Sequence, residues 1–67
     1  MNEMNVGNKI KRLRQEKGWT QEKLAHESGI AFASLNKIEN GNVTPQESTL
    51  RCIAEALETT VKALKGE

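Results

Sequence analysis

Residues 21–40 read QEKLAHESGIAFASLNKIEN. This stretch holds two short apolar patterns with helical spacing, separated by Ser28-Gly29. Ala25 supplies a small side chain where two packed helices would approach most closely, and Gly29 can adopt the positive φ that a tight turn requires. The stretch therefore predicts a short helix, a turn at Gly29 and a second helix over about residues 31–39. The residues expected to face the core are Leu24, Ile30, Leu35 and Ile38.

The residues before this stretch predict a first, amphipathic helix. Apolar side chains recur from Val6 to Leu13 at the spacing of one helical face, and Gly18 can take the left-handed conformation that ends a helix. Thr20 then has the side chain and the position of an N-cap, whose hydroxyl accepts from a free amide of the following turn. The next helix is therefore expected to begin at Gln21.

The residues after the central stretch predict two more helices. Thr44-Pro45-Gln46-Glu47 has the pattern of a capping box with proline at the first helical position. An apolar stripe then runs from Leu50 to Leu57, and Val61 and Leu64 mark a short last helix. No strand-like alternation or repeat interrupts these patterns, so the sequence predicts an all-α fold of five helices.

Length and composition limit the protein further. The chain has 67 residues, which leaves room for one domain with a small core; we expect a flexible N-terminus over residues 1–5 and the domain over residues 6–65. Cys52 is the only cysteine, which excludes an intrachain disulfide and favours a reducing compartment. No apolar run approaches the roughly 20 residues of a membrane span, and the N-terminus lacks the order of a signal peptide. We therefore expect a cytoplasmic protein without a membrane partner.

Charge is distributed unevenly along the chain, although the net charge is only +1. Residues 1–37 carry seven Lys and Arg against four Glu, a net charge of +3, whereas residues 38–67 carry three against five, a net charge of −2. Such a molecule can turn its basic side towards phosphates. A solvated helical surface would explain the same charges, so charge alone does not decide between these interpretations.

Several motifs lie in a fixed order between Val6 and Leu64: Ile10-Lys11-Arg12-Leu13-Arg14, Lys17-Gly18-Trp19-Thr20-Gln21, Leu24-Ala25, Gly29-Ile30, Ile38-Glu39-Asn40-Gly41, Pro45 and Thr49-Leu50. Together they resemble the phage-repressor and Cro-like helix-turn-helix proteins, often called Xre-type. The resemblance implies a compact, lambda-repressor-like bundle of five helices. It also implies that the protein binds operator DNA, usually as a dimer, and regulates transcription.

The resemblance assigns DNA contacts to individual positions. The helix over residues 31–39 would lie in the major groove, with base readout by Ala31, Phe32, Ala33, Asn36 and Lys37. Phosphate contacts would come from Gln21, which would also brace the recognition helix, and from Ser34 and Asn40. Arg12 and Arg14 in the first helix are further candidates for phosphate contacts. The expected partner is double-stranded DNA, with a roughly palindromic operator if the chain forms a homodimer through its last two helices, where Val61 and Leu64 are candidate contacts.

The chain also departs from the pattern of this family. The recognition helix begins with Ala31-Phe32-Ala33 instead of polar residues, which removes an N-cap worth about 1 kcal/mol and most hydrogen-bonding readout. Phe32 is predicted on the exposed side, where its ring fits the thymine methyl group; packing onto the neighbouring helix and a role in a protein interface are the alternatives. Glu47 stands where the family prefers an apolar residue, and Glu58 where it commonly has glycine.

Catalysis is not expected from this inventory of residues. The sequence has no Ser/His/acid arrangement, no paired carboxylates on an apolar wall and no phosphate-binding glycine loop, and a single His cannot hold a structural metal alone. We therefore expect no catalytic residues, no metal, no cofactor and no small-molecule substrate.

The predicted function is a sequence-specific DNA-binding transcriptional regulator, most simply a repressor. The alternative is a protein-interaction module, such as an antitoxin-like partner-binding domain with weak DNA affinity. The apolar start of the third helix and the small net charge favour that alternative. A DNA-binding fragment of a larger machine is a third interpretation.

Overall fold

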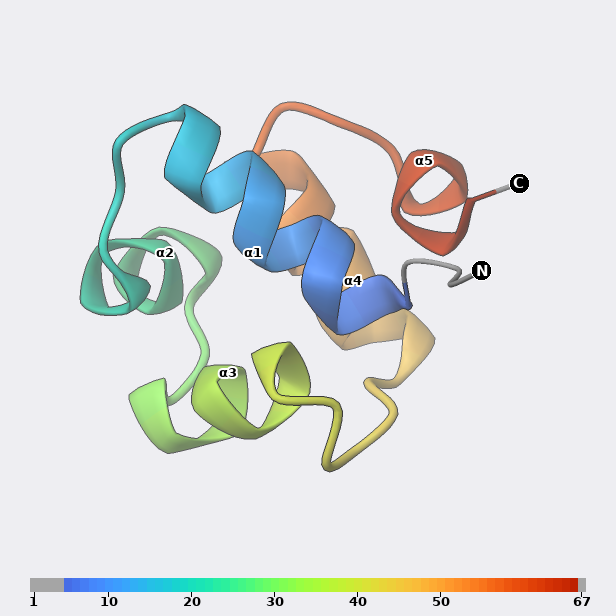
Figure 1. Ribbon diagram of the computed structural model, residues 1–67, viewed down its shortest axis with the longest axis horizontal. Helices are drawn as coiled ribbons and strands as arrows, with labels where there is room; N and C mark the ends of the chain where they lie inside the picture. Colours follow the sequence, from blue (N-terminus) through green and yellow to red (C-terminus); the bar gives the residue numbers. More distant parts are fainter. Residues whose placement is uncertain (1–4, 67) are drawn as a thin grey trace.

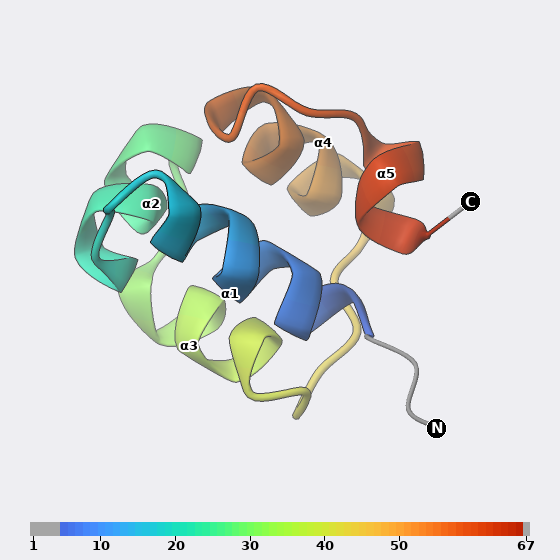
Figure 2. The same cartoon turned by 45° about the horizontal axis from the view of Figure 1, so that its top comes forward.

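The computed structural model describes residues 5–66 and confirms an all-α bundle of five helices. The helices are α1 (Val6–Glu16), α2 (Gln21–Ser28), α3 (Phe32–Glu39), α4 (Glu47–Ala56) and α5 (Val61–Lys65). Figure 1 shows α1 crossing the middle of the molecule in front of α4, with α2 and α3 on one side and α5 on the other. Turning the molecule separates α1 from α4 and shows α3 alongside α1 (Figure 2). None of these helices has both the length and the apolar character that a bilayer crossing demands.

The core lies where the five helices meet. Each helix contributes one large side chain that is fully buried: Ile10, Leu24, Leu35, Ile53 and Leu64. Burial of Leu64 corrects one expectation from the sequence, because a side chain in the core cannot contact a second copy. Val61 is only partly buried at the edge of this core. Since the core takes a residue from every helix, the position of α3 depends on all the others.

Capping residues set the starts of three helices. The Asn5 side chain accepts a hydrogen bond from the Asn8 amide at 2.8 Å, so residue 5 belongs to the domain as the N-cap of α1. The Thr20 hydroxyl accepts from the Lys23 amide at 3.1 Å, which confirms the predicted cap of α2. Thr60 caps α5 in the same way. The rest of the flexible segment predicted for residues 1–5 lies outside the described residues.

The predicted start of α4 is wrong. The helix begins at Glu47 with Gln46 as N-cap, and no side chain makes a capping hydrogen bond there. Pro45, expected as the first helical residue, precedes the cap and lies beside Ile38 and Val43. Gln46 has extended backbone angles (φ −72°, ψ 161°), so the first helical residue is Glu47 and Pro45 lies in the α3–α4 link.

Helices α1 and α3 approach each other backbone to backbone at Gly7. A Cβ atom built on Gly7 would lie 2.2 Å from the carbonyl oxygen of Ile38 and 3.0 Å from that of Glu39. Both carbonyls belong to the last turn of α3. Only glycine permits this approach, so Gly7 fixes the C-terminal end of α3 against α1.

Candidate nucleic-acid interface

A buried ion pair ties the C-terminal end of α3 to α1. Glu39 and Arg14 are 4% and 8% exposed. The Arg14 guanidinium donates from Nε to Glu39 Oε2 at 2.8 Å and from Nη2 to Glu39 Oε1 at 3.1 Å. Its third nitrogen, Nη1, donates to the carbonyl oxygen of Trp19 at 2.7 Å. This two-pronged geometry is the strongest arrangement for a guanidinium and a carboxylate, and it joins α1, the α1–α2 link and α3.

Three side-chain amides extend this ion pair towards the surface. Gln21 Nε2 donates to Glu39 Oε1 at 3.0 Å, and Asn36 Nδ2 donates to Gln21 Oε1 at 3.1 Å. Asn40 Nδ2 donates in turn to Asn36 Oδ1 at 3.0 Å. We call these five residues, Arg14, Glu39, Gln21, Asn36 and Asn40, the Glu39 network. It runs from the interior to exposed Asn40 and joins the start of α2 to α3.

The carboxylate at the buried end sets the direction of every hydrogen bond in the network. Ionised Glu39 can only accept, so Gln21 must turn its NH₂ group towards it and its oxygen towards Asn36. Asn36 must then donate to Gln21 and accept from Asn40. The orientations of the three amides are therefore defined before any ligand binds.

The N-terminal end of α3 is apolar and exposed, in contrast to the polar Glu39 network at the C-terminal end. Ala31 is the N-cap and makes no side-chain hydrogen bond, as the sequence predicted. Residues 31–34 are all exposed, and 47% of Phe32 is accessible to solvent. The ring therefore does not bury itself on the neighbouring helix, which removes one of the alternatives for it. Three consecutive apolar residues stand on the surface at this end.

The remaining predicted residues of α3 line a shallow groove beside the α3–α4 link. Ser34 and Lys37 are exposed there, next to Val43 and Pro45 of the link. Val43 is 45% exposed and was not identified from the sequence, because it follows no helical pattern.

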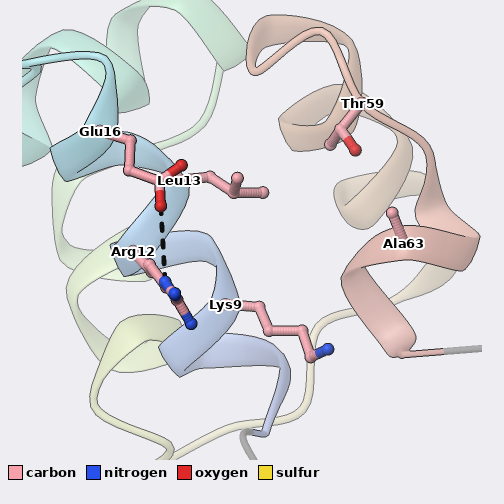
Figure 3. Close-up of a pocket in the computed structure, with 6 residues that line it drawn as sticks. All are labelled: Lys9, Arg12, Leu13, Glu16, Thr59 and Ala63. Atoms are coloured by element: carbon pink, nitrogen blue, oxygen red, sulfur yellow. Dashed lines mark ion pairs between the residues drawn. The ribbon is translucent and has the colours of Figure 1, made fainter.

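Neither of the two arginines predicted as phosphate contacts lies on this exposed surface of α3 and the α3–α4 link. Arg14 is buried and its guanidinium is used inside the molecule, which corrects its assignment to the surface. Arg12 lines another groove, between α1, the α4–α5 link and α5 (Figure 3). There its Nε lies 3.4 Å from Glu16 Oε2. The structure thus brings Gln21, Asn36 and Asn40 together in the Glu39 network. Ser34 and Lys37 lie on α3, the helix that also carries Asn36.

Comparison with known proteins identifies this arrangement. A family model described as helix-turn-helix matches residues 10–64. The chain belongs to the phage-repressor and Cro-like helix-turn-helix family. In this helix-turn-helix protein α2 and α3 are the paired helices, Gly29 between them has φ of 73°, and α3 is the recognition helix.

Individual relatives agree with this assignment. The immunity repressor protein of Bacillus phage phi105 is 39% identical over 64 residues, which cover 96% of this chain and 44% of the relative. The chain therefore spans less than half the length of this relative. This relative is named as a repressor, in agreement with the expectation that the chain is not an enzyme.

Two solved structures show the same architecture. SinR, the master regulator for biofilm formation, in complex with DNA has 33% identity and a TM-score of 0.82, covering 88% of this chain and 95% of that one. The DNA-binding domain of the P22 c2 repressor has a TM-score of 0.89 at 22% identity, covering 96% of this chain and 84% of that one. The second likeness concerns the fold alone.

Proposed function

We propose that this helix-turn-helix protein is a sequence-specific transcriptional repressor that inserts α3 into the major groove of DNA. The observation that carries the proposal is the Glu39 network, which holds α3 against α1 and α2 while residues 31–34, Lys37 and Asn40 remain exposed. A recognition helix must be rigid and accessible at once. The repressor name of the phage relative and the DNA complex of SinR support the same function.

The proposed contacts divide between phosphates and bases. Gln21 is the first residue of α2, and the N-terminus of a helix suits phosphate oxygens. Asn40 is the C-cap of α3, so only its side-chain amide is proposed to donate to a phosphate. Ser34 is a third candidate on the exposed side of α3. Arg12 lines a separate groove and is proposed only as an auxiliary phosphate contact. Arg14 is buried and is not proposed to contact DNA.

Base readout would fall on the exposed face of α3. Lys37 carries three donors and can reach guanine O6 and N7 or a phosphate. Asn36 is partly buried, and both of its amide atoms are already bonded to protein. Asn36 can therefore contact a base only through the N–H and the oxygen lone pair that these two hydrogen bonds leave free. Ala31, Phe32 and Ala33 would add apolar contacts.

We further propose a homodimer on a roughly palindromic operator, acting in the cytoplasm where DNA is accessible. With Leu64 buried, the candidate contacts are partly exposed Val61 and the outer face of α4. Two recognition helices would then sit about 34 Å apart, one turn of DNA.

Selection of bound duplexes from a random pool, followed by a salt titration on the selected duplex, tests this function. We expect one enriched motif with two related half-sites, and affinity that falls with salt at a slope of about −0.9 per phosphate neutralised. A matched pair of variants controls for charge: Lys37→Ala should reduce the slope or change the motif, and Lys62→Ala on α5 should do neither. Absence of salt-dependent binding would contradict the proposal and favour the protein-interaction module.

A further inference from the structure

We infer that the first turn of α3 is selective for the C5 methyl group of pyrimidines, and that it treats 5-methylcytosine like thymine. The inference rests on the proposed function and specifies the chemistry that this end of the helix recognises. It depends on Phe32, Ala31 and Ala33, which form an exposed apolar surface at the N-terminus of the recognition helix. We call these three residues the apolar tip.

The apolar tip offers no side-chain hydrogen bond. Its members carry two methyl groups and one phenyl ring, and the N-cap Ala31 bonds to no amide of α3 through its side chain. The first polar side chain of the helix is that of Ser34. Most groups along the major-groove edges of base pairs are donors or acceptors, and covering them with an apolar surface would leave them without a partner. The C5 methyl group of thymine is the apolar exception, and 5-methylcytosine carries the same group.

The position of the apolar tip suits close approach to a base. Phe32 lies one turn before Asn36, so the two residues share a side of α3. The ring is 47% exposed, which leaves a large apolar area to be covered. Alanine on either side adds little bulk, so the end of the helix can approach the base edges closely. The other end of α3 is held by the Glu39 network, so the apolar tip has a defined place relative to the polar residues.

The size of the effect follows from the methyl group itself. Burial of one methyl or methylene group is worth about 0.8 kcal/mol, which corresponds to about a fourfold change in affinity. Replacement of thymine by deoxyuridine removes this group and leaves every hydrogen-bonding atom of the base in place. The same position can also be filled with cytosine and with 5-methylcytosine, each paired with guanine, which tests the methyl group in a second base.

The experiment measures binding of the selected duplex with each thymine replaced in turn by deoxyuridine. We expect one position in each half-site at which the replacement lowers the affinity of the wild-type protein for the duplex about fourfold. The Phe32→Ala variant should lose this penalty, and Phe32→Leu, which keeps an apolar side chain, should retain part of it. Val43→Ala is the matched control, because Val43 is equally exposed but lies in the α3–α4 link; the penalty should persist there. At the same position 5-methylcytosine should bind more tightly than cytosine.

Two results would overturn the inference. Wild-type protein that binds every deoxyuridine duplex as tightly as the parent would show that no methyl group is read. A penalty that persists in full in Phe32→Ala, with unchanged helical circular dichroism, would assign the methyl contact to another residue. In both cases salt-dependent binding would leave the proposed function standing. Loss of all salt-dependent binding by the wild type would instead contradict the proposed function, and the inference with it.

Discussion

The two ends of α3 differ in almost every physical respect, although the helix has only eight residues. The C-terminal end is polar, buried and bonded to α1 and α2 through the Glu39 network. The N-terminal end is apolar, exposed and without a side-chain cap. One end of α3 is thus held in a fixed orientation, and the other end is free of side-chain bonds and exposes the surface that we propose contacts DNA. Substitutions at the two ends should therefore affect different properties.

The largest expected effect comes from breaking the buried ion pair. Glu39→Gln keeps the size of the side chain and an acceptor for Gln21, but it leaves the Arg14 guanidinium buried without a carboxylate. Losing one partner of a buried pair costs about 3–5 kcal/mol, a large share of the total stability of a small domain. Urea unfolding followed by circular dichroism measures this loss. The matched control is Glu27→Gln, which breaks the exposed Lys23–Glu27 pair and should cost about 0.5 kcal/mol or less. Equal losses of unfolding free energy in the two variants would show that the Glu39 network does not hold α3 in place.

The second effect tests the approach of α1 to the same end of α3. Gly7→Ala would place a Cβ atom 2.2 Å from the Ile38 carbonyl, so the helices must move apart. Overpacking of this kind costs about 1–3 kcal/mol. The neighbouring exposed variant Asn8→Ala should be close to neutral in the same unfolding measurement, because alanine favours the helix. If Gly7→Ala proved as stable as the parent, the close approach would not constrain α3.

The third effect concerns binding and not stability. Lys37→Ala should leave unfolding almost unchanged, because the side chain is exposed. If Lys37 reads a base, it should weaken DNA binding by about 1–3 kcal/mol and relax the preference at one position of the operator. Competition among duplexes that differ at single positions measures both quantities. A uniform loss across all duplexes would instead assign Lys37 to a phosphate.

The smallest effect comes from repairing the missing cap at the other end. Ala31→Ser provides a hydroxyl that can accept from a free amide of the first turn, and it should stabilise the protein by about 1 kcal/mol. Ala33→Ser places the same hydroxyl inside the helix, where it cannot act as an N-cap, and serves as the control in thermal unfolding. No gain from Ala31→Ser over Ala33→Ser would mean that the amides at the tip of α3 are already well solvated.

The sequence predicted most of what depends on neighbours along the chain. The five helices, the Thr20 cap and the turn at Gly29 follow from local patterns, and the structure confirms them. Glu58 was identified as standing in a glycine position, and it adopts a φ of 60°, where glycine is normally favoured. Such features need no knowledge of distant contacts.

Features that depend on contacts between helices were not predictable in the same way. Arg14 belongs to a basic run and was assigned to the surface, whereas its partner Glu39 lies 25 positions away. Gly7 carries no local signal, because its role depends on the carbonyls of α3. The late start of α4, with Gln46 in an extended conformation, also had no signal in the local motif. Gln21 was expected to brace the recognition helix, and its hydrogen bond with Asn36 agrees with this expectation. The expectation came from the resemblance, which already implied a fold in which α2 and α3 touch.

The most direct test of our central claim is a titration of the isotope-labelled protein with the selected duplex, followed by the amide resonances in nuclear magnetic resonance spectra. We predict that the largest shifts occur at residues 31–37, Gln21 and Asn40, and that Thr59 and Ala63 in the groove near Arg12 move little. We also predict that raising the salt concentration reverses the shifts. Shifts concentrated on α4 and α5, with residues 31–37 unchanged, would contradict the claim that α3 presents its apolar end and its exposed face to DNA.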